Sequence, residues 1–273
     1  MTTAQRGDHF YELCDIMKKL LEPAPNGCPW DREQTLKTLQ PFLIEEAYEV
    51  LEAIDENDPR EHCEELGDLL FQIVFQAELR AREGNFGIDD VVRAITTKMT
   101  RRHPHVFADA KVADSTEVLQ NWGKLKAAEH AEKGIKRRAL DGVPVNLPAL
   151  LRAQRIGEKA AAVGFDWPDI DGVRDKVHEE LREIDEAVRG GNQAEIEHEV
   201  GDLLLAVSRL SAKLGVAPED ALRAALQRFT GRFEAVEDRV IAAGRQVADT
   251  PIEELDRLWN EVKRLPPDTL PKK

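Results

Sequence analysis

Apolar residues recur every three to four positions along almost the whole chain, which is the spacing of amphipathic helices. No segment shows the alternating pattern of a half-buried strand, and Asn, Gly and Pro residues separate the helical stretches. The pattern predicts an all-α protein with helices at about residues 8–21, 33–56, 60–83, 89–102, 114–133, 147–162, 172–189, 192–214, 218–243 and 251–264.

An acidic pattern occurs twice, each time spread over two consecutive predicted helices. The first copy consists of Glu46, Glu49, Glu65 and Asp68. The second copy repeats each acid 134 residues further on, as Glu180, Glu183, Glu199 and Asp202. One such pattern would mean little in an acidic chain, but two copies at a single offset indicate a duplicated unit.

Further segments repeat in the same order. Trp30-Asp31 is matched by Phe165-Asp166-Trp167. Each half also ends in Trp-x-x-x-Lys, at Trp122 and Lys126 and at Trp259 and Lys263. We therefore predict two homologous all-α domains, at residues 1–135 and 146–273, joined by a charged linker at 136–145 that is rich in helix breakers.

The four acids of each copy should meet at one place. Residues three apart share a helix face, and the two acid pairs of each copy are equidistant from a breaker, Asn57 or Gly191. A helical hairpin that turns at these breakers brings equidistant residues to the same height, with apolar neighbours such as Leu66 and Leu181 packed on its other side. Four neighbouring carboxylates need protons or cations between them, and an all-oxygen set of ligands suits Mg²⁺ or Mn²⁺.

Two other interpretations of the acids explain less of the pattern. A single acidic stretch is usually a solvated helix face, but that interpretation does not account for two copies that are symmetric about their turns. A di-iron carboxylate site normally needs Glu-x-x-His on two helices. Only Glu195-x-x-His198 fits in the relevant hairpin, and the first half has no counterpart.

Composition narrows the possible functions. The net charge of −14 over 273 residues argues against general binding to a nucleic-acid backbone, and a polyanionic ligand would need bridging cations. Cys14, Cys28 and Cys63 are sparse and lack metal-ligand spacing, so we expect free thiols. The polar N-terminus lacks a signal core, and no apolar run approaches the ~20 residues of a membrane span. We therefore predict a cytoplasmic protein.

These motifs resemble those of the MazG nucleoside triphosphate pyrophosphohydrolases. The resemblance rests on Glu-Glu-x-x-Glu followed after 15 residues by Glu-x-x-Asp, and on accessory segments at residues 27–31, 101–107 and 163–167. It covers nearly the whole chain, including the tandem arrangement of full-length bacterial members. It implies Mg²⁺-dependent hydrolysis of NTPs, and often dNTPs, to the monophosphate and pyrophosphate, in nucleotide-pool sanitation or control. It also implies a homodimer in which paired helices build four-helix cores.

The second copy is the expected catalytic site. Its predicted catalytic residues are Glu179, Glu180, Glu183, Glu199 and Asp202, of which Glu179 is the candidate for orienting the attacking water. The last four are the predicted metal ligands, with Glu46, Glu49, Glu65 and Asp68 as a second metal-binding set. The predicted nucleotide-binding residues are Lys176, Glu180, Arg228, Arg232, Trp259 and Lys263. Surface ion pairing of the cations and core packing of Trp259 remain open as alternatives.

The two copies differ one turn before the acids. Lys176 and His178 of the second copy stand where the first copy has Phe42 and Ile44. We therefore predict that the second domain carries most of the turnover, and that the first is weaker, regulatory or architectural. Two alternatives remain for the chain: a specialised pyrophosphohydrolase for a dUTP-like or phosphoribosyl nucleotide, and a helical regulatory module with degenerate sites. The intact acids of both copies argue against a regulatory module with degenerate sites.

Overall fold

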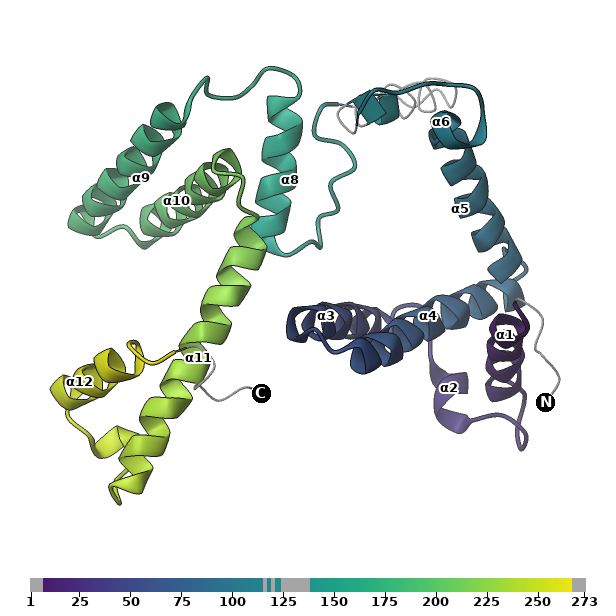
Figure 1. The fold of residues 1–273 in the computed structure, drawn as a ribbon, viewed down its shortest axis with the longest axis horizontal. Coiled ribbons are helices and arrows are strands. Elements are labelled where there is room, and N and C mark those ends of the chain that lie inside the picture. Colours follow the sequence, from purple (N-terminus) through teal and green to yellow (C-terminus); the bar gives the residue numbers. More distant parts are fainter. Residues whose placement is uncertain (1–6, 115–116, 119–120, 124–137, 267–273) are drawn as a thin grey trace. The chain divides into compact units, whose positions relative to one another are not determined.

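The structure, a computed structural model, describes residues 7–114, 117–118, 121–123 and 138–266. Within these ranges all the regular elements are helices and no strand occurs, so the all-α prediction is confirmed (Figure 1). The chain divides into two compact units, at residues 1–129 and 130–273. Among the described helices, none has the length and apolar character that crossing a membrane requires.

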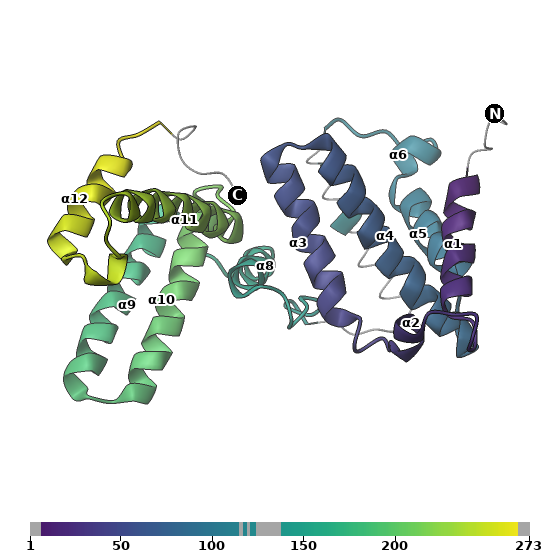
Figure 2. The same ribbon diagram turned by 90° about the horizontal axis from the view of Figure 1, so that it is seen from below.

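The first unit is built on a helical hairpin. Its helices are α1 (Asp8–Leu20), α2 (Pro29–Glu33), α3 (Gln40–Glu56), α4 (Pro59–Arg82), α5 (Ile88–Arg102) and α6 (Pro104–Phe107). Helices α3 and α4 run antiparallel and side by side, and α1 packs against α4 (Figure 2). The core between these elements consists of Cys14, Met17, Leu21, Leu39, Val74 and Phe75.

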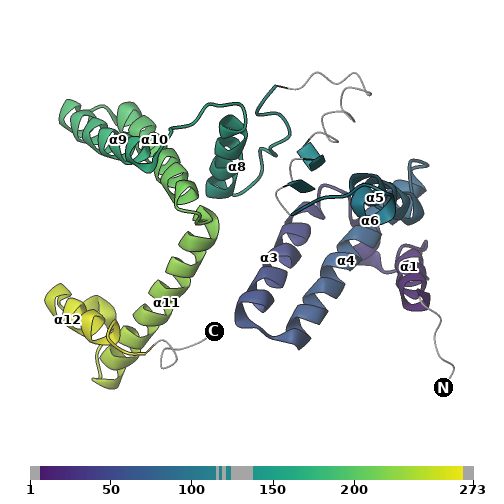
Figure 3. The ribbon, with the colours of Figure 1, turned by 45° about the horizontal axis from the view of Figure 1, so that its top comes forward.

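The second unit contains a matching hairpin. Its helices are α8 (Ala149–Ala161), α9 (Ile170–Gly190), α10 (Gln193–Lys213), α11 (Pro218–Ala242) and α12 (Ile252–Val262), with a 3₁₀ turn, η1, at Val247–Asp249. Helices α9 and α10 form the hairpin, and α8 packs against α10 and α11. Helix α11 leaves the hairpin as a long arm with α12 packed on it (Figure 3).

Both hairpin turns use local capping chemistry. Asn57 follows α3 in the left-handed conformation, with φ of 56°, and the Asp58 carboxylate accepts a hydrogen bond from the Arg60 amide at 2.8 Å. Gly191 follows α9 with φ of 68°, and the Asn192 side chain accepts a hydrogen bond from the Ala194 amide at 3.1 Å. The turns predicted at Asn57 and Gly191 are therefore confirmed.

The structure corrects two expectations. The helix predicted over residues 33–56 begins only at Gln40, because the Thr35 and Thr38 hydroxyls accept hydrogen bonds from each other's amides and hold the preceding residues in turns. The apolar neighbours Leu66 and Leu181 are only partly covered within the described residues, with 47% and 45% of their surfaces exposed. The helix predicted over 114–133 and the linker over 136–145 extend outside the described residues, and Lys126 lies outside them altogether.

Candidate active site

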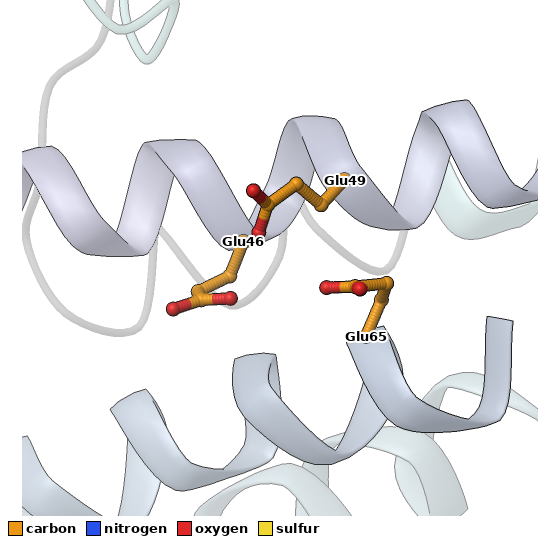
Figure 4. A group of neighbouring side chains, drawn as sticks. All are labelled: Glu46, Glu49 and Glu65. Atoms are coloured by element: carbon orange, nitrogen blue, oxygen red, sulfur yellow. The ribbon is translucent and has the colours of Figure 1, made fainter. Parts of the chain in front are cut away.

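The first hairpin brings acids from its two helices together. Glu46 and Glu49 extend from α3, and Glu65 extends from α4 into the space between the helices (Figure 4). One carboxylate oxygen from each of the three lies within 4.8 Å of the others. Asp68 stands close enough that its charge affects Glu46. The turn geometry at Asn57 thus produces the cluster expected from sequence symmetry.

The acids of the first cluster repel one another. The pKa of Glu46 is raised because its carboxyl is desolvated and because Asp68 and Glu49 have charges of the same sign. The pKa of Glu65 is raised in the same direction by desolvation and then by the charge of Glu49. The Gln72 amide lies 3.5 Å from Glu46 Oε1, at the outer limit of a hydrogen bond. Close acids with raised pKa values favour binding of a proton or a cation.

The second hairpin forms a more buried cluster. Carboxylate oxygens of Glu180, Glu199 and Asp202 lie within 4.8 Å of one another, and Glu180 is only 2% exposed. Glu183 adjoins them: its pKa is raised by desolvation and by its hydrogen bond with Glu180, while the charge of Lys176 opposes the shift. All four predicted metal ligands of the second copy therefore meet at one place.

Lys176 partly balances the second cluster. Its Nζ lies 2.7 Å from Glu180 Oε1 and 2.9 Å from Glu179 Oε1, and these two carboxylates raise the pKa of the ammonium group. Glu180 Oε2, by contrast, is buried and has no hydrogen-bond partner. A buried carboxylate oxygen without a donor is costly unless a ligand satisfies it. Glu179 faces Lys176 and is not one of the three clustered acids.

The donor sets fit a hard divalent cation. Both clusters offer only carboxylate oxygens, which are the ligands that Mg²⁺ and Mn²⁺ prefer. The unsatisfied Glu180 Oε2 gives the second cluster an additional reason to bind a cation. His198 Nε2 lies 3.5 Å from Asp202 Oδ2 and is 70% exposed, so no Glu-x-x-His pair replaces an acid in the described cluster.

A pocket of about 620 Å³ opens beside the second cluster. Glu180, Asp202 and Lys176 line one part of it, and Trp167, Asp166 and Arg209 line another. The Asp166 carboxylate forms ion pairs with Lys213, whose Nζ lies 2.8 Å from Oδ2, and with Arg209, whose Nη2 lies 2.5 Å from Oδ1. These two cations lower the pKa of the Asp166 carboxyl.

The sequence predictions missed Arg209, Lys213 and the role of Asp166. One available signal was the comparison at the 134-residue offset, which places Arg209 opposite Phe75 and Lys213 opposite Leu79. Cations in one copy at positions that are apolar in the other indicate a local change of function. The offset alone, however, does not indicate that both cations contact Asp166.

The remaining predicted nucleotide-binding residues lie on the α11–α12 arm. Arg228 and Arg232 belong to α11, while Trp259 lies on α12 and Lys263 follows it. The Trp259 ring packs 5.2 Å from that of Phe229, measured between centroids. Among the described residues, no hydrogen bond, ion pair or ring contact links these four side chains to the acids. The structure thus joins Lys176 to the cluster and does not join the other four to it.

Comparison with known proteins places both clusters in a defined domain class. A family model described as the MazG nucleotide pyrophosphohydrolase domain matches residues 34–107 and 171–236, and each match contains one complete set of acids. The chain therefore belongs to the MazG family.

Relatives extend this similarity over nearly the whole chain. The nucleoside triphosphate pyrophosphohydrolase of Escherichia coli (strain K12) is 46% identical over 254 residues, which are 92% of this chain and 96% of that protein. The nucleoside triphosphate pyrophosphohydrolase/pyrophosphatase MazG of Thermotoga maritima is 43% identical, with 95% and 97% covered. A nucleoside triphosphate pyrophosphohydrolase of Mycolicibacterium smegmatis is 32% identical, with 81% and 70% covered.

Proposed function

We propose that this chain hydrolyses nucleoside triphosphates to nucleoside monophosphates and pyrophosphate in a Mg²⁺-dependent reaction, chiefly in its second unit. The observation that carries the proposal is the buried Glu180, which lies in an acidic cluster, contacts Lys176 and lines a pocket large enough for a nucleoside. The names of the relatives that share 43% and 46% identity support this reaction class.

The acids and Lys176 have different roles at this site. Glu180, Glu183, Glu199 and Asp202 would hold the metal, and a bound Mg²⁺ would offset the charge of the triphosphate and lower the pKa of its water ligand. Lys176 exchanges its contact with Glu179 for a phosphoryl oxygen of the substrate, which leaves the Glu179 carboxylate able to accept a hydrogen bond from water. The first cluster binds metal as well and serves a weaker or regulatory role.

Two copies of the chain assemble into a dimer in this proposal. Both hairpins leave large apolar side chains exposed, including Leu66 and Ile73 in the first unit and Leu181 and Leu204 in the second. Such surfaces are stabilised by burial at roughly 25 cal/mol per Å², and pairing of hairpins would complete four-helix cores. In the dimer, Arg228, Arg232, Trp259 and Lys263 contact nucleotide. Light scattering tests the assembly: Leu204→Glu should shift the mass toward a monomer.

The domain limits and the location follow the same proposal. We assign residues 1–135 and 146–273 to the two MazG domains and 136–145 to the linker. The three cysteines are free thiols, one buried and one exposed, which suits the reducing cytoplasm.

Pyrophosphate release from a panel of NTPs and dNTPs, with Mg²⁺ or with EDTA, tests the reaction. Turnover should require the metal, and Glu180→Gln should abolish it while Glu186→Gln, a change at an exposed acid of the same helix, should not. Retained turnover in both Glu180→Gln and Glu183→Gln would refute the site assignment. Absence of turnover with every nucleotide would favour a regulatory module instead.

A further inference from the structure

The pocket of the second unit contains a cation that the proposed hydrolysis does not use. Arg209 lies on α10, seven residues beyond Asp202, so both side chains lie on the same helix face about two turns apart. At 1.5 Å per residue this separation is about 10 Å. The two residues line the same pocket, whose wall between them includes Leu205 and Ala206.

Arg209 is held in a fixed orientation. It is 8% exposed, and its Nη2 donates to Asp166 Oδ1 at 2.5 Å, while Lys213 holds the other Asp166 oxygen at 2.8 Å. Gly157 of α8 provides the space for the guanidinium group, because a Cβ at this position would lie 2.0 Å from Arg209 Nη1. Arginine has five N–H donors, and Asp166 is its only hydrogen-bond partner among the described residues. Donors are therefore left for a ligand in the pocket.

The same fold forms without these charges. In the first unit the position that matches Arg209 is Phe75, which is completely buried in the core, and the position that matches Lys213 is Leu79, which packs against that core. A helical hairpin of this kind therefore does not need an ion pair here, and burying a charged pair contributes little stability by comparison with apolar packing. The presence of the Arg209–Asp166 ion pair in the second unit therefore indicates a role in ligand binding.

The dimensions fit a nucleoside. With the α-phosphate placed at the acids, a ribose and base directed along the pocket would extend toward Arg209, which lines another part of it. Trp167 lines the pocket and packs closely on Gly172, where a Cβ would lie 2.6 Å from its ring, so it offers a fixed aromatic face. Ile156 and Ala160 of α8 supply apolar surface.

We propose that Arg209, positioned by Asp166, donates hydrogen bonds to the base oxygen at C6 of a purine or C4 of a pyrimidine and so determines base specificity. Guanine carries an oxygen at C6 and uracil or thymine at C4, whereas adenine and cytosine carry amino groups at these positions. An arginine has no acceptor for an amino group. The second unit therefore prefers keto bases to amino bases. This inference rests on the proposed NTP hydrolysis and specifies its substrate class.

The test compares kcat/KM for pyrophosphate release from GTP and UTP with that from ATP and CTP, using the full chain and Mg²⁺. The wild type should favour the keto nucleotides about tenfold or more, as expected for a hydrogen bond from a charged donor. Arg209→Asn, whose amide can present an acceptor, and Asp166→Asn should both bring this ratio near one. Arg239→Met, which breaks an exposed ion pair with Glu261 on the arm, should leave the ratio unchanged.

The ratio separates a specificity role from a structural one, because a damaged fold lowers all four values together. An even ratio in the wild type, or an unchanged ratio in an active Arg209→Asn variant, would overturn the proposal. Calorimetry with GMP and AMP keeps the test independent of turnover: the wild type should bind GMP more tightly, and Arg209→Asn should not. If no NTP is hydrolysed but GMP is still preferred, the proposed reaction fails and the base preference stands; equal binding would overturn the preference.

Discussion

The two hairpins are built alike, but the volume beside each is used differently. At matched positions the first unit has Phe42, Phe75 and Leu79, where the second has Lys176, Arg209 and Lys213. The three apolar residues belong to or pack against a core cluster, whereas two of the three cations line a pocket. Gln72, buried beside the first acids, is matched by Ala206 in the second pocket wall.

The difference shows how a duplicated unit can specialise while it keeps the same type of helical hairpin. Hairpin turns and acid spacing are retained in both copies, so both keep the same carboxylate cluster. Replacement of apolar side chains by cations, and of Gln by Ala, then converts a filled interior into a ligand-sized space. Charge compensation differs as well, because Lys176 contacts Glu180 while the first cluster has Phe42 at that position.

The largest expected effect is on the filled core of the first unit. Phe75 is fully buried, so Phe75→Ala should destabilise this unit by about 3–5 kcal/mol through lost burial and a residual cavity. Hydrogen exchange by mass spectrometry, read separately for peptides of each unit, would locate the loss. Cys63→Ala, at an exposed position on the same helix, is the control and should cost less than about 1 kcal/mol. A loss shared equally by both units would contradict the division of the chain into independent cores.

The next effect compares the two metal clusters. Glu183→Gln should lower kcat/KM by about 100- to 1000-fold, because metal ions at such sites supply several kcal/mol of transition-state stabilisation. Glu49→Gln, the matched change in the first unit, should lower it less than tenfold. Steady-state pyrophosphate release measures both, and metal binding by calorimetry checks that each variant lost only its own site. Equal losses of activity would refute the asymmetry.

The parts of this comparison that are local in sequence were predictable. The hairpin turns depend on Asn57 and Gly191 and on the capping residues beside them, and the acid clusters follow from i, i+3 spacing. The pocket was not predictable, because it requires Asp166 from a loop, Arg209 from α10 and Gly157 from α8 to meet in three dimensions. The start of α3 was missed because hydroxyl hydrogen bonds of Thr35 and Thr38 outweighed an apolar periodicity that continued across them.

A smaller effect tests the cation beside the acids. Lys176→Phe gives the second unit the residue of the first, and should lower kcat/KM by about 10- to 100-fold through loss of a charged hydrogen bond to phosphate. The reciprocal change, Phe42→Lys, places an ammonium group one turn before the first acids.

Kinetics of the reciprocal variant should be measured in a Glu183→Gln background, where activity of the first unit is visible. A gain there would show that the missing cation limits the first copy. Unchanged kcat/KM in Lys176→Phe would show instead that the ion pair with Glu180 has no part in binding phosphate.

The smallest effect is the pH dependence of metal binding. Glu46 and Glu65 of the first cluster have pKa values raised above the ordinary 4.5, whereas the upward shift of Glu183 in the second cluster is opposed by the charge of Lys176. A carboxyl with a raised folded-state pKa binds protons more tightly when folded, so its ionisation destabilises the metal-free fold as pH rises above about 4.5. Metal must displace these protons, which weakens affinity by up to about tenfold per pH unit for each proton released.

On acidification from neutral pH, Mg²⁺ affinity should therefore fall earlier and more steeply at the first cluster than at the second. Calorimetry on Glu183→Gln, which keeps the first site, and on Glu49→Gln, which keeps the second, measures each separately; identical pH profiles would mean that Lys176 does not distinguish the two clusters electrostatically.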